Sequence, residues 1–389
     1  MIGDRELIAH NAHFESKWLK AKFGLQPARL FCTLTAARLL SNGTKQSNKL
    51  EAVLEREFGV RIPKALGQSD WGGIFLTEEQ LQYAANDVRY LHALKARQIE
   101  QLRGAGLERV FELECALIPV VIKMEQAGFA VDAARLTEIR DCARNAANQH
   151  KAELAKKFGR NVNIDSPEEL KNALIEAGLQ IENTTEENLC AIEHPLAEEV
   201  LAYRGVEMQR RQAQALLEAI GADGRINASF NALGTQSSRF ASTNPNLQQV
   251  KRGEIRSAFV AAPGNRLIVA DYSQIELRAA AHLSGDEAML GAFQDGKDLH
   301  VQTAAVLLNK APEAATKDDR QIAKSANFGL IYGQQAPGLK VYARTKYGVT
   351  LTVEQATAIR RRFFSHYKGL AAWHRKAHAS SSYVKEGRT

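Results

Sequence analysis

Apolar and polar positions along this chain recur mainly with the period of an amphipathic helix. This spacing predicts a mostly helical stretch from about residue 106 to 250, preceded by a smaller unit of mixed or helical character. Ser166, Pro167 and Glu169 stand at the N-cap, first and third positions of a helix start, and Gly128 is expected to cap the helix before it. The earlier helices are expected near residues 14–22, 33–41, 48–58 and 78–101.

The apolar run Leu-Ile-Val-Ala at 267–270 departs from this helical period and is typical of a buried strand. Asp271 follows it directly and opens the sequence Asp-Tyr-Ser-Gln-Ile-Glu-Leu-Arg. A carboxylate at the end of such a strand is held rigidly at a surface or cleft, where it can bind a divalent metal. Taken alone, this pattern is only a weak indication of function.

A second motif follows about 50 residues later. Arg320, Lys324, Phe328 and Tyr332 recur every four residues, so on a helix all four share one face. Two cations can hold a triphosphate, and two rings can stack on a base or a sugar. An ordinary amphipathic helix with a solvated basic end would explain any one of these residues. It would not explain the ordered set downstream of the first motif.

Composition agrees with a polyanionic partner. The chain has 389 residues, which suggests two or three domains, and carries a formal net charge of +7. Its four cysteines form no Cys-x-x-Cys pair, so neither a zinc site nor a disulfide framework is indicated. The sequence shows no apolar run of membrane-spanning length and no signal peptide at its start. We expect a monomeric cytoplasmic protein.

Together, the motifs at 271–278 and 320–333 closely resemble the first two polymerase motifs of the family A (DNA polymerase I-like) DNA polymerases. The resemblance implies a mostly helical α+β fold. A right-hand polymerase, with palm, fingers and thumb, would follow a partial ribonuclease H-like 3′–5′ exonuclease domain. The expected domains are 1–105 (exonuclease), 106–250 (start of the polymerase domain and thumb) and 251–389 (partial palm and fingers).

The implied reaction is attack by a primer 3′-hydroxyl on the α-phosphate of a deoxynucleoside triphosphate, with two Mg²⁺ ions. The implied partners are primer–template DNA and deoxynucleoside triphosphates, in a bacterial or phage-infected cell. Asp271 and the carbonyl of Tyr272 would bind metal, and Glu276 would exclude ribonucleotides. Asp271, Arg320 and Lys324 would be the catalytic residues. The implied nucleotide-binding residues are Gln274, Glu276, His300, Arg320, Lys324, Phe328 and Tyr332.

The segment 234–249 is rich in small and amide side chains around Arg239, a composition suited to a DNA backbone and minor groove. The resemblance places Arg239 at the primer-terminal minor groove. Family members usually carry Thr-Gly-Arg where this chain has Ser-Ser-Arg at 237–239, so the local turn is expected to differ. The implied DNA-binding residues are Arg239, Asn246, Gln248 and Arg256.

Segments 11–15, 68–71 and 83–87 resemble parts of DEDD-type exonucleases, which implies metal-binding roles for Glu15 and Asp87 and a water-orienting role for Tyr83. Glu15 stands where that family more often has Asp. The expected first exonuclease motif is missing: Asp-Arg-Glu at 4–6 lies too close to Glu15, and its acids are expected to be solvated loop charges.

The third polymerase motif, His-Asp-Glu, does not occur after Tyr332. Both catalytic centres therefore look incomplete, and we expect a fragment of a longer polymerase. The alternative is a non-catalytic remnant that still binds DNA or nucleotides; an exonuclease-only protein is disfavoured by the missing first motif. Flanking sequence with an upstream Asp-x-Glu and a downstream His-Asp-Glu would favour the polymerase.

Overall fold

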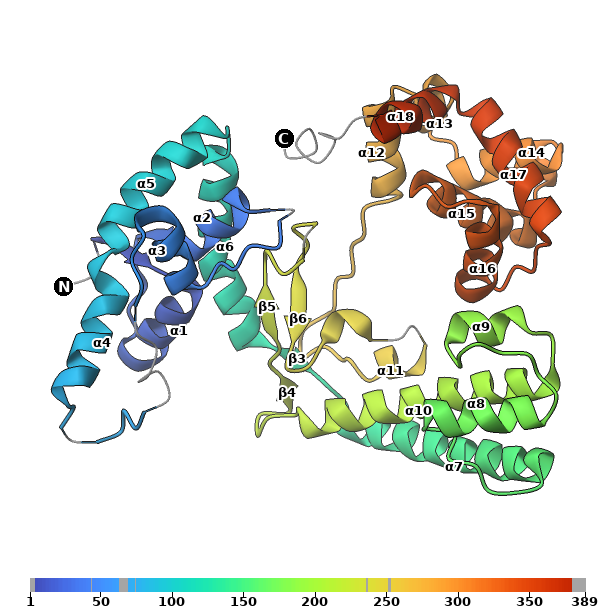
Figure 1. Cartoon of the computed structure of the whole chain (residues 1–389), viewed down its shortest axis with the longest axis horizontal. Coiled ribbons are helices and arrows are strands. Elements are labelled where there is room, and N and C mark those ends of the chain that lie inside the picture. The colour runs from blue at the N-terminus through green and yellow to red at the C-terminus, as the bar shows by residue number, and fades with distance from the viewer. Residues whose placement is uncertain are drawn as a thin grey trace. The chain divides into compact units, whose positions relative to one another are not determined.

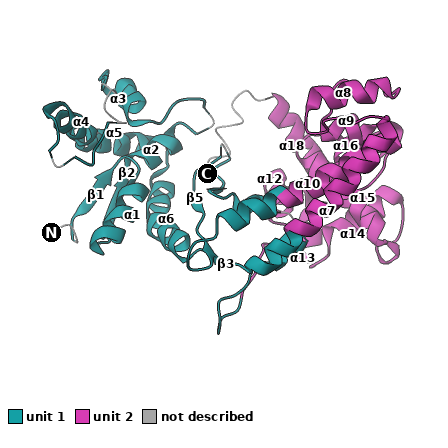
Figure 2. Ribbon diagram, turned by 90° about the horizontal axis from the view of Figure 1, so that it is seen from below, with its two compact units in different colours: residues 1–139, 211–266 teal, residues 140–210, 267–389 magenta. Residues whose placement is uncertain are grey.

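The computed structural model describes residues 4–42, 44–62, 69–73, 75–235, 237–250 and 253–379. It divides into two compact units (Figure 2). Unit 1 comprises residues 1–139 and 211–266, and unit 2 comprises residues 140–210 and 267–389. Helices α7 and α10 contribute residues to both units. The mostly helical α+β fold expected from the sequence is confirmed (Figure 1).

The N-terminal part of unit 1 is a parallel two-stranded sheet, β1 with β2, whose strands are connected through α1. Its core includes Phe31 and Leu102. The helix expected at 78–101 is two helices, because the backbone leaves the helical hydrogen-bond pattern at Tyr90. The elements are β1 (Glu6–Ala9), α1 (Ala12–Phe23), β2 (Arg29–Cys32), α2 (Thr33–Leu40), α3 (Leu50–Phe58), α4 (Glu78–Arg89) and α5 (Leu91–Gly104).

The remainder of unit 1 is a long helix and two short antiparallel strand pairs, β3 with β4 and β5 with β6. Gly128 ends the long helix at φ 56°, as expected; a Cβ there would lie 2.7 Å from the carbonyl oxygen of Ile226. The elements are α6 (Glu108–Ala127), β3 (Phe129–Ala130), β4 (Arg225–Ile226), β5 (Ser229–Asn231), β6 (Ala241–Thr243), η1 (Leu247–Gln249) and α11 (Glu254–Ser257).

Unit 2 contains two groups of helices, each with its own core. In the first, the Ser166 side chain accepts a hydrogen bond from the backbone N–H of Glu169 and Pro167 begins the helix, which confirms the predicted helix start. Its elements are α7 (Ala133–Phe158), α8 (Pro167–Glu176), α9 (Glu186–Ala191) and α10 (Pro195–Glu218). Buried residues such as Leu174 and Tyr203 form its core.

The second part of unit 2 packs around Leu277, Leu330 and Phe363, all fully buried. Its elements are α12 (Ile275–Ser284), α13 (Glu287–Gln294), α14 (Leu299–Leu308), η2 (Pro312–Ala314), α15 (Lys317–Ile331), α16 (Ala336–Tyr347), α17 (Val353–His366) and α18 (Lys368–Ala379). Figure 1 shows α15 and α16 beside one another, with α17 adjacent.

The strand predicted at 267–270 is wrong. These residues form no ladder, and the side chains of Ile268 and Val269 are 93% and 91% exposed. A strand requires backbone partners, and none of the described strands pairs with this segment. An apolar run therefore does not become a strand on its own.

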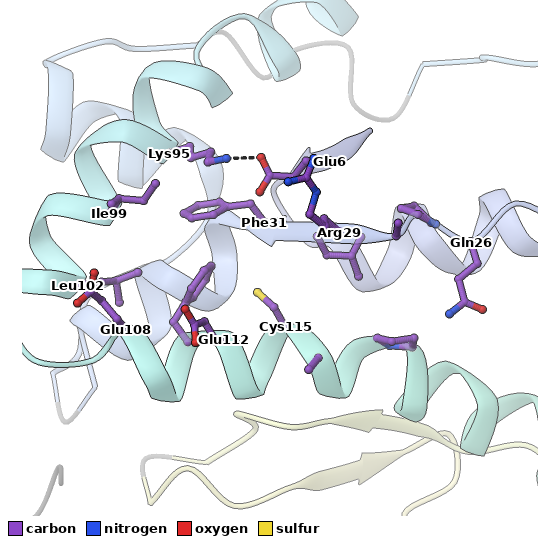
Figure 3. Close-up of a pocket in the computed structure, with 16 residues that line it drawn as sticks. Glu6, Gln26, Arg29, Phe31, Lys95, Ile99, Leu102, Glu108, Glu112 and Cys115 are labelled. Atoms are coloured by element: carbon purple, nitrogen blue, oxygen red, sulfur yellow. Dashed lines mark hydrogen bonds and ion pairs between the residues drawn. The ribbon is translucent and has the colours of Figure 1, made fainter. Parts of the chain in front are cut away.

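The prediction that Glu6 is a solvated loop charge is also wrong. Glu6 begins β1 and pairs with the ammonium group of Lys95, whereas Asp4 is exposed. Figure 3 shows this ion pair at one wall of a cavity of about 730 Å³. Glu108 and Glu112 also line the cavity, so its cations face carboxylates of the same chain.

Candidate nucleotide- and DNA-binding site

Helix α15 carries the predicted nucleotide-binding face. Thr316 and Asp319 form a capping box at its start, and Tyr332 is the C-cap residue. Arg320, Lys324 and Phe328 are partly exposed and Tyr332 is 63% exposed. The rest of the helix is mainly buried, including Ala323, Ala326 and Leu330. The four residues thus lie on the outward face of an otherwise buried helix.

The two cations on this face differ in their surroundings. Nε and Nη2 of Arg320 lie 2.9 and 2.7 Å from Oδ2 of Asp298. Burial acts to raise the pKa of Asp298, but hydrogen bonds from Arg320 and the backbone of His300 outweigh it and hold that pKa below its usual value. Lys324 forms no hydrogen bond or ion pair with any residue that the structure describes. Its ammonium group is therefore available to an anion.

His300 lies behind this face rather than on it. The ring is 3% exposed, its centroid is 5.8 Å from that of Phe328, and burial lowers its pKa to about 4. The amide nitrogen of Asn327 lies 2.9 Å from its Nδ1. A neutral imidazole is thus held in place, and its predicted contact with a triphosphate requires the ring to become accessible.

The residues that fix this imidazole were not evident from the sequence pattern. Thr303 donates to Oδ1 of Asn327 at 3.0 Å, and its hydroxyl lies 2.7 Å from that of Tyr367. Asn327 is fully buried. A polar amide between the apolar positions of a helix was the available signal, because a buried amide requires hydrogen-bonding partners.

The first polymerase motif joins this face through α12. The Tyr332 hydroxyl donates to Oε2 of Glu276 at 2.8 Å, which brings two predicted nucleotide-binding residues together. Gln274 is the N-cap of α12 in a left-handed conformation, φ 54°, and its buried Oε1 has no hydrogen-bond partner among the described residues. Strained backbone and unsatisfied polar atoms are features that concentrate at functional sites. Asp271 and Tyr272 precede this turn and are exposed.

The described residues do not form a complete metal site. No group of three or more His, Cys, Asp or Glu side chains lies close enough together in the described ranges to hold an ion. Asp271 has the oxygen ligands that magnesium prefers, but two ions held side by side need more carboxylates than one. The donor set therefore does not fit the implied pair of magnesium ions.

The predicted DNA-binding residues lie in unit 1, around the hairpin of β5 and β6. Arg239, Asn246, Gln248 and Arg256 are all exposed. Ser238 adopts φ 56°, a backbone conformation that glycine takes most easily. The sequence therefore differs from the family's usual Thr-Gly-Arg, but the backbone at this position is of the kind that glycine favours.

The N-terminal part of unit 1 forms hydrogen bonds with this hairpin. Nη1 of Arg38 donates to Oδ1 of Asn231 at 2.9 Å, and Nδ2 of Asn42 donates to Oγ of Ser238 at 3.0 Å. Arg38 lies on α2 and Asn42 lies just beyond its end. These contacts therefore connect this part of the chain to the β5–β6 hairpin, almost 200 positions later. The exonuclease-like segment thus braces the loop that carries Arg239.

A buried carboxylate strengthens the same connection. Glu125, on α6, is 2% exposed and accepts hydrogen bonds from Nζ of Lys17 at 2.9 Å and from the backbone of Phe230 at 2.8 Å. Nε2 of His13 lies 3.2 Å from the same carboxylate. One side chain therefore joins α1, α6 and β5.

Of the predicted exonuclease residues, Tyr83 and Asp87 lie on α4, whereas Glu15 lies on α1. Burial raises the pKa of Glu15, and its Oε2 is buried without a hydrogen-bond partner in the part of the chain that the structure describes. Asp87 is exposed, and its pKa is raised by desolvation and then by the nearby charge of Glu51. Tyr83 packs with its ring centroid 5.9 Å from that of Trp71. The related segment at 68–71 begins at Gln68, which lies outside the described residues.

Helix α15 thus carries a cationic and aromatic face, and Tyr332 at its end contacts Glu276 of the motif at 271–278. Residues 133–386 match DNA polymerase family A, and residues 1–102 match the 3′–5′ exonuclease family. The chain belongs to DNA polymerase family A. In the described ranges, no helix is both long and apolar enough to cross a membrane.

Relatives and a solved structure agree with this assignment. DNA polymerase I of Aquifex aeolicus is 33% identical over 96% of this chain, and that of Chloroflexus aurantiacus is 34% identical over 85%. The chain spans 68% and 38% of these relatives' lengths, respectively. The POL domain of Pol1 from M. smegmatis, in complex with DNA primer–template and dNTP, is similar with a TM-score of 0.81 and 25% identity. That match covers 95% of this chain and 64% of the other.

Proposed function

We propose that this chain is the part of a template-directed DNA polymerase that binds the incoming deoxynucleotide and the primer end. The main support for this proposal comes from the outward face of α15. On that face Lys324 has no anionic partner among the described residues, and Tyr332 contacts Glu276. The relatives named DNA polymerase I and the neighbour bound to primer–template and dNTP support this proposal.

Each residue of the α15 face has a role in this proposal. Lys324 and Arg320 hold the triphosphate, with Asp298 keeping the Arg320 guanidinium in position. Phe328 and Tyr332 form the wall against the nascent base pair. The nucleotide-binding set also includes Gln274, Glu276 and His300.

The DNA-binding part of the proposal rests on unit 1. Arg239, Asn246, Gln248 and Arg256 are exposed around a hairpin that is braced from α2 and α6. An exposed arginine on a fixed loop suits a minor groove or a phosphate. We propose that the chain divides at about residues 105 and 250 into an exonuclease-like segment, a segment with the start of the polymerase domain and the thumb, and a segment with part of the palm and fingers. We also propose that the protein is a cytoplasmic monomer.

The metal-dependent part of the proposal is limited by the donor set. Asp271 and the carbonyl of Tyr272 are the groups of the first motif that would contribute ligands, and magnesium would supply charge neutralisation when bound. In the exonuclease-like segment, Glu15 and Asp87 would contribute and Tyr83 would orient water. The buried Oε2 of Glu15, which no described residue satisfies with a hydrogen bond, supports that assignment.

A second function is a binding module without catalysis, and the absence of a three-ligand group in the described ranges favours it. The polymerase must bind both DNA and deoxynucleotides, whereas the binding module must bind DNA or nucleotides. They differ in whether a primer is extended.

Nucleotide binding is tested by titrating residues 1–389 with a fluorescent deoxynucleoside triphosphate. Lys324→Ala should weaken binding about tenfold, because it removes a charge-assisted contact, while duplex DNA binding changes little. Lys317→Ala is the matched control, since Lys317 is an exposed lysine in the first turn of the same helix. Equal affinities for Lys324→Ala and the parent protein would remove the assigned role of this face.

A further inference from the structure

The fold of unit 1 brings together two cysteines, Cys32 and Cys115, that lie far apart in the sequence. Cys32 is the last residue of β2 and the N-cap of α2, whereas Cys115 lies within α6. The two residues are 3% and 7% exposed and belong to the same hydrophobic cluster. Both are free thiols in the structure. They form a buried dithiol that the spacing of cysteines in the sequence does not reveal.

Several contacts bring the end of β2 against α6 at this point. The ring centroid of Phe31, the residue before Cys32, lies 4.7 Å from that of Phe111, one turn before Cys115. The backbone N–H of Cys32 is hydrogen-bonded to the Cys115 thiol. Figure 3 shows the Cys115 sulfur pointing from α6 toward the strand that carries Phe31. The Cys115 sulfur thus lies against the residue that carries the other thiol, and rotation of the side chains is the movement that would join the two sulfur atoms.

The two thiols have different surroundings. Burial raises the pKa of the Cys115 thiol to about 12, so this group is protonated near neutral pH. The Cys32 sulfur accepts hydrogen bonds from the backbone N–H groups of Ala12 at 3.4 Å and Thr35 at 3.5 Å, at the start of α2. N–H donors at a helix N-terminus favour negative charge on a sulfur atom. This difference makes Cys32 the better nucleophile of the two.

A cavity borders each member of the pair. Cys115 lines the cavity of about 730 Å³ that Figure 3 shows. Cys32 lines a second cavity of about 380 Å³, also in unit 1, whose wall includes both cations and carboxylates. Because that wall carries both signs of charge, neither an anion nor a cation is strongly preferred. A small neutral molecule can therefore approach Cys32 from this side.

We propose that Cys32 and Cys115 are an oxidative modification site, at which a small disulfide converts the two thiols into one disulfide between β2 and α6. The Cys32 thiolate attacks one sulfur of the small disulfide, whose S–S bond breaks and releases a thiolate. Cys115 then gives up its proton as its sulfur attacks the Cys32 sulfur, and the second small thiolate leaves. The protein loses two electrons and two protons, and the small disulfide is reduced to two thiols.

This disulfide would tie the exonuclease-like segment to the helix that supports the β5–β6 hairpin. Helix α6 also carries Glu125, which contacts both α1 and β5. A disulfide that closes a long loop mainly restricts the unfolded chain, and the gain in stability grows with loop length. Oxidation should therefore raise the thermal stability of the protein. The site is separate from the nucleotide- and DNA-binding residues, and the inference does not rest on the proposed function.

The test treats the folded Cys142→Ser/Cys190→Ser variant with bis(2-hydroxyethyl) disulfide and digests it with trypsin without reduction. This background removes the two cysteines outside the buried pair, which would otherwise form adducts of their own. Mass spectrometry should find residues 30–38 linked to residues 110–123, the tryptic peptides that carry Cys32 and Cys115. The melting midpoint should rise by about 5 °C on oxidation and return when dithiothreitol reduces the disulfide.

Single variants in the same background separate the two roles. In Cys115→Ser, the small thiol should remain on Cys32 as a mixed disulfide, because no second sulfur displaces it. In Cys32→Ser, Cys115 should stay unmodified over the same time; its modification would contradict the assignment of Cys32 as the attacking residue. Circular dichroism verifies that each variant folds. In urea, the two peptides should carry separate adducts, because closing the long loop of an unfolded chain is disfavoured.

The decisive result comes from the Cys142→Ser/Cys190→Ser chain itself, so it does not depend on whether a core variant folds. A mixed disulfide on Cys32 that never proceeds to the linked peptide would overturn the proposal. Linkage that appears only in urea, or no reaction at either cysteine in the folded chain, would overturn it as well. Nucleotide binding, measured on the same protein, tests the proposed function separately.

Discussion

The hydroxyl of Tyr332 donates a hydrogen bond to Oε2 of Glu276 over 2.8 Å and so ties the end of α15 to the first turn of α12. Two motifs that are more than 40 residues apart in sequence thereby share one short contact. The Glu276 carboxylate is held in a fixed direction, beside a ring that is proposed to border the new base pair. A carboxylate fixed in this way is suited to discriminating between nucleotides by the shape of the sugar.

Sugar selection should therefore depend on Glu276. Glu276→Ala should narrow the difference in affinity between deoxynucleoside and ribonucleoside triphosphates about tenfold, because the group that would exclude a 2′-hydroxyl is removed. Titrating both nucleotides against parent and variant measures the ratio. Tyr332→Phe should have a smaller effect in the same direction, since it frees the carboxylate without deleting it. An unchanged ratio in Glu276→Ala would leave this side chain a structural role only.

The buried imidazole of His300 should make stability depend on pH. Burial lowers its pKa to about 4, below the value of about 6.5 expected when unfolded. Below pH 6.5 the unfolded chain therefore binds a proton that the folded chain does not, and stability falls as the pH drops from about 6.5 toward 4. The full difference corresponds to about 3 kcal/mol.

Urea unfolding at several pH values checks this sign. His300→Gln should show a flatter dependence between pH 6.5 and 4 than the parent chain. The comparison matters because burial also lowers the pKa of His10 and of His374, so the parent curve alone contains other contributions. Parallel curves for parent and variant would contradict the assignment to His300.

The brace beneath the β5–β6 hairpin should be stabilising. Glu125→Ala leaves the backbone N–H of Phe230 and the ammonium of Lys17 without their acceptor, which should cost about 2 kcal/mol of unfolding free energy. Glu125→Gln keeps an acceptor and should cost less. Lys20→Ala serves as a charge control, because Lys20 lies on α1 like Lys17 but takes no part in this contact. Equal stabilities for Glu125→Ala and the parent would exclude an energetic role.

Local patterns were the part of this fold that the sequence predicted well. The four-residue spacing from Arg320 to Tyr332 and the cap at Ser166 depend only on neighbouring residues, and both appear as expected. The run at 267–270 and the charge of Glu6 were misjudged because their states depend on partners far along the chain. A strand needs a second strand, and Glu6 has Lys95.

The same distinction explains what was missed in the site. Asn327 fixes His300 only because α14 and α15 pack together, and Arg38 reaches Asn231 across 193 positions. Neither pairing leaves a periodic signal in one sequence. The residue types were visible, but their partners were not.

Primer extension decides between the catalytic and the binding functions. Two-metal phosphoryl transfer requires several carboxylates that hold both ions near the reacting phosphate. Asp271 is exposed, and no described group of three potential ligands exists around it or elsewhere in the described ranges. Magnesium with few protein ligands keeps most of its waters and is poorly fixed.

We therefore expect residues 1–389 to bind primed DNA in a salt-sensitive way without extending the primer. Purified protein is given primed template, magnesium and all four deoxynucleotides, with Asp271→Ala as the matched control. Extension above that control would show that the chain assembles a working metal site, and the binding-only function would then be rejected.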